Sequence, residues 1–206
     1  DVLTLNETMY RMVEAGVTHC FMEVSSHGVA MHRIEGLHFV GGVFTNLTQD
    51  HLDFHKTFDN YLAAKSKLFK QVSASYQMKE GKGAVINVDD DYGQAIVDVT
   101  TAPMITYSTQ GKGTMNASEL AITAKSSKFN LSYDGKNYSI STKIAGMFNV
   151  YNTLAAVGAA LYEGLTMEEI VSALTTFTAV PGRFELIEEG QDFAVVVDYA
   201  HTPDGL

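Results

Sequence analysis

Two histidines and two aspartates occupy six consecutive positions in the stretch DHLDFH, from Asp50 to His55. If this stretch is extended, His51, Asp53 and His55 share one face, and if it is helical, His51 and His55 do. Either geometry could present imidazoles to a divalent cation. The alternative is structural: the residues cap and turn the chain before a helix near Phe58, and the histidines lie on a solvated edge.

Lys65 follows this stretch on an apparent helix, in the sequence YLAAKSKLF. A protonated lysine repels a divalent cation, so an exposed helical lysine is the simplest interpretation. A second interpretation is chemical. An amine with a lowered pKa reacts with carbon dioxide to give a carbamate, and the carbamate is an anionic oxygen ligand that suits Mg²⁺. The residues alone leave both interpretations open.

The motif MEVSSHG, residues 22–28, places a carboxylate and two hydroxyls at the end of an apolar run. Glu23 is a candidate Mg²⁺ ligand, and Ser25 is a candidate contact for an anionic substrate. The structural alternative for such residues is capping or plain surface exposure. Arg33, in HRIEG, is a candidate for a bidentate contact with a carboxylate or phosphate, with a solvated side chain as the alternative.

Four further candidates lie in the second half of the chain. In AGMFNVYNTLAA, Asn149 and Asn152 are three residues apart at a helix start and therefore share a face. N-capping accounts for Asn149, whereas the carboxamide of Asn152 can satisfy a donor and an acceptor on an adenine edge. Arg183, in PGRFE, is suited to phosphate, and Asp198, in VVVDYAHTPD, is suited to a ribose hydroxyl.

The composition indicates an ordinary globular protein, since the 206 residues are 46% hydrophobic and 18% charged. A formal charge of −10 argues against a general affinity for nucleic acid or anionic membranes, because both bind through clustered Lys and Arg. No window approaches the roughly 18 apolar residues of a membrane span. The start DVLTLNETMY does not resemble a signal peptide, and Cys20 is expected as a core thiol. We therefore expect a cytoplasmic protein.

Helices and strands are expected to alternate in the first half. Thr4 and Glu7 have the spacing of a capping box for a first helix, and Gly16 fits its C′ position. THCFMEV, HFVGGVFTN and GAVINVDD predict buried strands, and TFDNYLAAKSKLFKQV predicts a helix between the second and third. This alternation predicts parallel βαβ units, with ligand sites at the C-terminal ends of the strands. Three polar residues lie at those ends: Glu23, Asn46 and Asp89.

The pattern changes after PMITYS. Apolar and polar residues alternate over positions 118–146, and together with a turn at Asp134-Gly135 they predict a small antiparallel accessory sheet. Helices are expected at about 148–162 and 166–177, the second with a capping box at its start. Pro181-Gly182 interrupts the chain, and two more strands are predicted beyond it.

Six motifs occur in order: MEVSSHG with HR, FTNLTQDHLDFH, YLAAKSKLF, GMFNVYN, VPGRFE and VVVDYAHTPD. Together they resemble the Mur ligases over almost the whole chain, and in particular the member that adds the third amino acid of the peptidoglycan stem peptide. The resemblance implies an α/β fold over residues 1–180, with a mononucleotide-binding, mostly parallel sheet flanked by helices and a small antiparallel accessory sheet. Residues 181–206 would begin a Rossmann-like C-terminal domain.

The resemblance also implies a cytoplasmic enzyme of cell-wall synthesis, with consequences for cell shape and cell division. Such a ligase uses ATP and Mg²⁺ to join meso-diaminopimelate or L-lysine to UDP-N-acetylmuramoyl-L-alanyl-D-glutamate, the UDP-N-acetylmuramoyl dipeptide. ATP phosphorylates the D-glutamate carboxylate, the amine attacks the acyl phosphate, and phosphate leaves. The resemblance implies neither nucleic-acid binding nor membrane insertion.

Site residues follow from the resemblance, motif by motif. Glu23, His51 and Lys65 resemble the magnesium ligands, with Lys65 as the carbamylated lysine (N6-carboxylysine) and with His51 and Lys65 in the catalytic role. The residues implied to bind substrate are Ser25 and Arg33, and those implied to bind ATP are Asn149, Asn152, Arg183 and Asp198.

Two features depart from the family's pattern. Position 31 is Met, where many diaminopimelate-adding relatives are expected to carry a polar residue, and the phosphate loop G-x-x-x-x-G-K-[ST] does not occur. We expect that loop and a substrate-binding threonine pair upstream of Asp1, so the chain as given is expected to be inactive. Asp53 and His55 receive only a supporting role. A ligase resembling folylpolyglutamate synthase and a metal-dependent hydrolase built on DHLDFH stay open as alternatives.

Overall fold

The computed structural model describes residues 1–47, 52–79, 81–178 and 180–200. His51 lies outside these ranges, and so does the end of the motif VVVDYAHTPD. The side chain of Asp53 is also outside the description, so its predicted supporting role stays a prediction.

The chain divides into two compact units, each assembled from several segments. The first comprises Asp1–Gly42, Gln49–Ala84 and Ala95–Pro103, and the second comprises Val43–Thr48, Val85–Gln94 and Met104–Leu206. The predicted boundary at residue 180 is a different kind of division, between evolutionary domains, and it stays a prediction.

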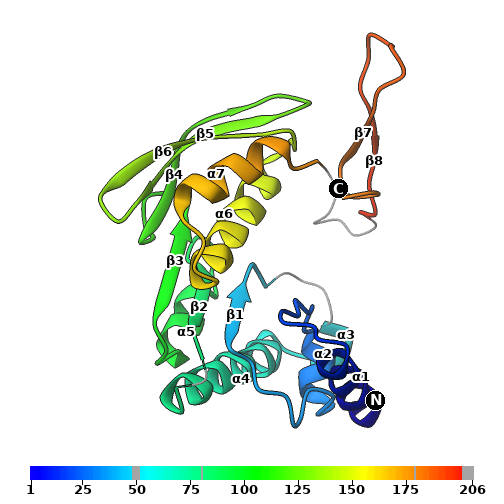
Figure 1. Ribbon diagram of the computed structural model, residues 1–206, viewed down its shortest axis with the longest axis vertical. Coiled ribbons are helices and arrows are strands. Elements are labelled where there is room, and N and C mark those ends of the chain that lie inside the picture. The colour runs from blue at the N-terminus through cyan, green and yellow to red at the C-terminus, as the bar shows by residue number, and fades with distance from the viewer. Residues whose placement is uncertain (48–51, 80, 179, 201–206) are drawn as a thin grey trace. The chain divides into compact units, whose positions relative to one another are not determined.

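The first unit is mainly helical. Within it, α2 and α3 pack against α4, which begins where the sequence predicts, with Thr57 as N-cap. Phe69 and Val72 of α4 lie against Gly42, where an added Cβ would come within 3.2 Å of both side chains. A larger residue would have to displace these side chains slightly, so glycine favours this close approach. The helices are α1 Val2–Glu14, α2 Ser26–Ala30, α3 Leu52–His55, α4 Phe58–Gln77 and α5 Gly93–Val99, of which α5 begins in the second unit (Figure 1).

The predicted capping box of the first helix is wrong. Asp1, and not Thr4, is the N-cap of α1, and its carboxylate accepts a hydrogen bond from the Thr4 N–H at 2.9 Å. Glu7 instead forms an exposed ion pair with Arg11 at 2.6 Å. The predicted end is confirmed, because Gly16 has φ +78° and its N–H donates to the carbonyl of residue 13, as in a Schellman motif.

The segment THCFMEV does not form the predicted strand. Residues 17–25 have no regular secondary structure, and Cys20 is exposed rather than a core thiol. A β-strand satisfies its backbone by pairing with neighbours, and among the described strands none pairs with this segment. Apolar composition identified a segment able to form a strand, but not whether a partner is present.

Six strands form one sheet in the order β1-β2-β3-β4-β5-β6. The Ala84 N–H donates to Pro103 O, and four residues on in both strands the Val88 N–H donates to Tyr107 O, which is the pattern of parallel pairing of β2 with β3. β3 also pairs in parallel with β4, whereas β4, β5 and β6 are antiparallel. The strands are β1 Gly41–Phe44, β2 Gly83–Asn87, β3 Met104–Ser108, β4 Met115–Ile122, β5 Ser127–Tyr133 and β6 Lys136–Thr142.

The antiparallel meander predicted over positions 118–146 is therefore confirmed. Its strands continue the main sheet and share β4 with it. Asp134 and Gly135 both have positive φ, +49° and +69°, and Tyr133 pairs with Lys136 across them. This is the two-residue hairpin turn whose twist matches that of the flanking strands.

The core of the second unit lies between the sheet and two helices, α6 Met147–Tyr162 and α7 Met167–Thr176. α7 begins with the predicted capping box between Thr166 and Glu169. On α6, an added Cβ at Gly158 would lie 2.6 Å from Val85 on β2, so a side chain there would force the helix away from the sheet.

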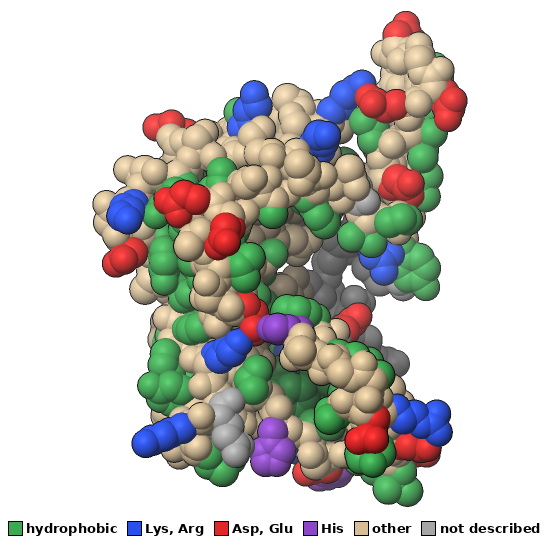
Figure 2. All heavy atoms as spheres, viewed as in Figure 1, with side chains coloured by type: hydrophobic (Ala, Val, Ile, Leu, Met, Phe, Trp, Pro, Cys, Tyr) green, Lys and Arg blue, Asp and Glu red, His purple; other side chains and the backbone are tan. Residues whose placement is uncertain are grey.

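Two further strands, β7 Glu185–Ile187 and β8 Val195–Val197, pair antiparallel as a separate ribbon, in agreement with the two strands predicted after Pro181-Gly182. Hydrophobic and acidic side chains lie side by side on its surface (Figure 2). Among the residues described, none of the helices combines the length and hydropathy of a membrane span.

Candidate functional site

The motif MEVSSHG leads into α2 rather than ending a strand. Ser25 is the N-cap of α2, and its Oγ accepts a hydrogen bond from the Gly28 N–H at 3.0 Å. Glu23 is exposed in the irregular segment just before it. The prediction that Glu23 follows a strand is therefore wrong, although its carboxylate stays accessible to a ligand.

Side chains from α2, α3 and α4 form a stack next to the first turn of α2. His55, on α3, is only 6% exposed, and its Nε2 lies 2.9 Å from the Oγ of buried Ser26 on α2. Its ring is parallel to that of Tyr61 on α4, with 4.9 Å between centroids and 5° between planes. The Nζ of Lys65, one turn further along α4, lies 5.2 Å from the centroid of the Tyr61 ring. We call Ser26, His55, Tyr61 and Lys65 the His55 stack.

Two more rings surround His55. Phe54 meets it edge-on at 4.9 Å, and His27 lies 5.6 Å away between centroids. The interpretation that the histidines of DHLDFH lie on a solvated edge is thus wrong for His55. Its contact with Ser26 also shows that one of its ring nitrogens is engaged by a hydroxyl.

Lys65 lies on a helix, as predicted, and is half-buried rather than fully exposed. Within the described part of the chain, no group of three or more His, Cys, Asp and Glu side chains is arranged to hold a metal ion. Lys65 as a free amine is not a ligand of that kind, and His51 lies outside the described residues. The predicted ligand set of Glu23, His51 and Lys65 therefore stays a prediction.

Arg33 lies just beyond the C-terminus of α2 with an exposed side chain. Its Nη2 donates to the Sδ of Met31 at 3.4 Å. Met31, where a departure from the family's pattern is predicted, is thus in direct contact with a predicted substrate-binding residue.

Asp89, two residues beyond β2, is the centre of a polar network. Its Oδ1 accepts a hydrogen bond from Ser108 Oγ at 2.6 Å, and its Oδ2 accepts from the Thr109 N–H at 2.7 Å and from the Tyr151 hydroxyl at 2.9 Å. The sequence placed Asp89 at a strand end but did not reveal its partners, which are 19 to 62 residues away along the chain.

The network fixes the charge state of both central groups. Burial raises the pKa of Asp89, but the hydrogen bonds from Ser108, Thr109 and Tyr151 outweigh it, and the pKa lies below the ordinary value of 3.8. Burial and the neighbouring Asp89 raise the pKa of Tyr151 above its ordinary value of 10. A neutral phenol therefore donates to a carboxylate at neutral pH, and this charge-assisted bond fixes α6 to the end of β2.

The two asparagines predicted at a helix start lie on the first turns of α6 and share a face. The prediction that Asn149 is the N-cap is wrong, because Gly146 occupies that position and Asn149 donates instead to Ala145 O at 2.7 Å. Asn152 Nδ2 donates to Asn149 Oδ1 at 3.3 Å, and the Asn152 side chain is exposed. Asn149 thus orients the amide of Asn152.

Arg183 and Asp198 lie at the same end of the β7–β8 ribbon. Asp198 Oδ2 accepts from the Phe184 N–H at 2.6 Å, next to the paired residues of the two strands. The Arg183 guanidinium lies over the ring of Tyr199, with its central carbon 4.7 Å from the centroid. Asp198 is thus hydrogen-bonded to the residue that follows Arg183, so the two predicted nucleotide-binding residues are close to one another.

An aromatic contact joins these two pairs within the second unit. Phe148, on the first turn of α6, meets Phe184 edge-to-face, with 5.4 Å between centroids and 72° between planes. Each phenylalanine is the sequence neighbour of a predicted nucleotide-binding residue. The contact therefore brings together two segments, one that carries Asn149 and Asn152 and one that carries Arg183 and is bonded to Asp198.

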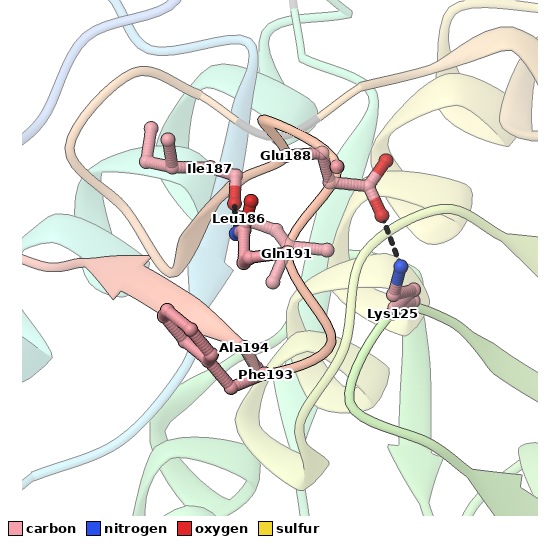
Figure 3. Close-up of a pocket in the computed structure, with 8 residues that line it drawn as sticks. Lys125, Leu186, Ile187, Glu188, Gln191, Phe193 and Ala194 are labelled. Carbon is pink, nitrogen blue, oxygen red and sulfur yellow. Dashed lines mark hydrogen bonds and ion pairs between the residues drawn. The ribbon is translucent and has the colours of Figure 1, made fainter.

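A cavity of about 300 Å³ lies elsewhere in the second unit, where an ion pair joins Lys125 and Glu188 (Figure 3). It contains none of the predicted site residues. Gln191 closes part of its wall by donating to Ile187 O at 2.6 Å. Its other lining residues are Leu186, Gly190, Phe193 and Ala194.

Comparison with known families and proteins gives a consistent result. The Mur ligase middle domain matches residues 1–160. The UDP-N-acetylmuramoyl-L-alanyl-D-glutamate--2,6-diaminopimelate ligase of Bacillus cereus is 42% identical over 206 residues, and that of Geobacillus kaustophilus is 44% identical over 206 residues. In both cases the match covers the whole chain but only 42% of the relative's length.

A solved structure of a UDP-N-acetylmuramoyl-L-alanyl-D-glutamate--2,6-diaminopimelate ligase matches the fold with a TM-score of 0.84 at 31% sequence identity. The match covers all of this chain and 42% of the solved one. The predicted fold class, an α/β sheet flanked by helices with antiparallel strands added, is thereby confirmed.

Proposed function

This chain belongs to the Mur ligase family, and we propose that residues 1–180 are most of the central ATP-binding domain of a longer ligase, with residues 181–206 beginning its C-terminal domain. The proposed enzyme joins a diamino acid to UDP-N-acetylmuramoyl-L-alanyl-D-glutamate at the cost of ATP, in peptidoglycan synthesis in the cytoplasm. The names of the two bacterial relatives favour 2,6-diaminopimelate as the diamino acid.

The observation that supports this proposal is the Phe148–Phe184 contact, because it joins the two segments that carry the four predicted ATP contacts. Asn152 has a carboxamide suited to the adenine edge, and Asp198 has a carboxylate suited to ribose hydroxyls. Arg183 supplies the cation for a phosphate group. One nucleotide needs all three kinds of contact, so their presence on two segments that meet at this aromatic contact supports ATP as the ligand.

Mg²⁺ is proposed to be held by Glu23, His51 and Lys65. The donor set fits the ion once Lys65 is a carbamate, because it then offers two oxygen donors and one imidazole. The neutral amine of Lys65 attacks the carbon of CO₂, an N–C bond forms as one C–O π bond breaks, and a proton passes to solvent. Bound there, the cation would neutralise charge that develops on the phosphate oxygens.

The remaining residues are proposed to bind the acceptor. Ser25 and Arg33 contact the UDP-sugar peptide, and they hold its D-glutamate carboxylate where it can attack the terminal phosphate of ATP. ADP leaves, the amine of the diamino acid attacks the acyl phosphate, and phosphate leaves as the amide bond forms. The buried contact of His55 with Ser26 argues against the alternative of a hydrolase built on DHLDFH.

The test is turnover by the full-length ligase that contains this chain. ADP formation is expected to require both the dipeptide acceptor and the diamino acid. Lys65→Ala is expected to abolish it, with partial rescue by short carboxylic acids, whereas Lys67→Ala, at an exposed position of the same helix, is the matched control. Unchanged turnover in Lys65→Ala would remove the carbamate, and turnover with a glutamyl-folate acceptor in place of the dipeptide would reassign the substrate.

A further inference from the structure

We propose that His55 is a positioning residue for Lys65, acting through the ring of Tyr61 and anchored by Ser26. The inference rests on the proposed function, because it assigns a role to a residue that the proposed ligand set leaves out. It concerns how the side chain of Lys65 is held, and not a direct contact of His55 with a ligand.

The geometry of the His55 stack is that of a platform. Tyr61 is 4% exposed, so its ring is fixed by packing, and His55 covers one region of that ring in a parallel arrangement at 4.9 Å. Lys65 Nζ lies 5.2 Å from the same ring's centroid. A lysine side chain is flexible, and a fixed ring beside its terminal nitrogen excludes some of its rotamers by steric contact, whatever the charge of the group.

The stacked rings of His55 and Tyr61 are connected to the turn that follows Glu23, the other candidate ligand among the described residues. His55 Nε2 is 2.9 Å from Ser26 Oγ, and Ser26 is 2% exposed. Ser26 is three residues from Glu23, at the first position of a helix that packs against α4. The stack is therefore a continuous line of contacts from the turn after Glu23 to the nitrogen of Lys65.

A purely structural role for His55 predicts a different pattern of effects. A buried histidine is costly unless its polar atoms are satisfied, and one that only fills space can be replaced by another ring with a loss of stability alone. A positioning role predicts, in addition, less carbamate at Lys65 and lower activity. Mutation of the residues that orient a metal ligand typically lowers metal affinity or activity by about 10- to 100-fold.

The experiment uses the full-length ligase with three test variants and two controls. His55→Phe keeps a ring but loses the contact with Ser26, Ser26→Ala removes the hydroxyl, and Tyr61→Leu removes the platform. Ser73→Ala is the matched control for Ser26→Ala. Ser73 is also a buried serine, it lies on α4 beyond Tyr61 and Lys65, and its Oγ accepts a hydrogen bond from the Thr101 N–H at 2.9 Å. Tyr61→Phe keeps the platform and separates the ring from the hydroxyl.

The readouts are the carbamate signal of Lys65 in ¹³C NMR after exchange into ¹³C-bicarbonate, the kcat and KM for ATP, and the urea unfolding midpoint. The His55→Phe, Ser26→Ala and Tyr61→Leu variants are expected to lose carbamate signal and about tenfold or more in kcat, with KM for ATP little changed. Ser73→Ala is expected to lose stability only, and Tyr61→Phe is expected to retain most of the signal.

A folded His55→Phe variant with full carbamate signal and kcat would overturn the proposal. If that variant does not fold, Ser26→Ala decides by the same criterion. Lys65→Ala is measured in parallel to separate the two levels of inference. An active Lys65→Ala enzyme contradicts the proposed function, whereas an inactive Lys65→Ala enzyme with unaffected His55 and Ser26 variants contradicts only the positioning role.

Discussion

The hydroxyl of Tyr151, on α6, donates a hydrogen bond to Oδ2 of Asp89, beyond the end of β2, with 2.9 Å between the two oxygens. These residues are 62 positions apart in the sequence. The same carboxylate also accepts from the backbone of Thr109 after β3, so one side chain connects two parallel strands and the helix that carries Asn149 and Asn152.

Tyr151→Phe is expected to lower the free energy of unfolding by about 1 kcal/mol, because it removes a hydrogen bond to a carboxylate that is only partly buried. Urea unfolding of the chain, followed by circular dichroism, measures the change. Tyr10→Phe is the control, since Tyr10 is 64% exposed on α1 and its replacement is expected to stay within about 0.5 kcal/mol of wild type. Equal midpoints for the two variants would show that the Asp89 bond contributes nothing.

Asp89 also predicts a pH dependence of stability. Its pKa in the folded protein lies below the ordinary value of 3.8, so the unfolded chain takes up the proton first as the pH falls. The stabilisation is complete above about pH 4 and is lost as the pH falls through the folded-state value. Asp89→Asn is therefore expected to flatten the acid limb of a plot of urea midpoint against pH. Asp192→Asn, at an exposed position, is expected to follow the wild-type curve.

Gly158→Ala is expected to destabilise the second unit by about 1 to 3 kcal/mol, because the new methyl group would lie 2.6 Å from a Val85 side-chain carbon. Helix propensity alone would favour alanine, so the sign of the effect is informative. Combining it with Val85→Ala makes room for the methyl group. The double variant is expected to be less destabilised than the sum of the single ones, and simple additivity would mean that the two residues do not meet.

Asn149 and Asn152 are expected to respond differently to truncation in the full-length ligase. Asn152→Ala removes an exposed amide, and it is expected to raise KM for ATP by about five- to tenfold with little change in stability. Asn149→Ala is expected to raise KM for ATP and also to lower stability, because its amide donates to Ala145 O at 2.7 Å. Nucleotide titration and urea unfolding separate the effects, and an unchanged KM in Asn152→Ala would remove that residue from the site.

Local signals in the sequence were sufficient for much of the fold. The capping box at Thr166, the Schellman glycine at position 16 and the Asp134-Gly135 turn are each determined by residues within five positions of one another, and the structure has all three. The short helices α2, α3 and α5 were not predicted, because four to seven residues are too few for a periodic pattern.

Features that depend on distant partners could not be predicted in the same way. The apolar run around Cys20 has the composition of a buried strand, yet it is exposed and irregular. Strand formation also requires a neighbouring strand to pair with, and the composition of the run itself does not reveal one. His55 was assigned only a supporting role because its contacts with Ser26 and Tyr61 follow from how three helices pack. The family motifs indicated which residues could form the site, whereas their contacts depend on the three-dimensional packing of the chain.

β1 lies at one end of the strand order, and it is four residues long with glycine at its first two positions. No described strand pairs with its outer side, and we expect an incoming extended segment to pair there. Produced by itself at high concentration, the chain is therefore expected to self-associate along this edge, and dilution or a competing β-peptide should reverse the association.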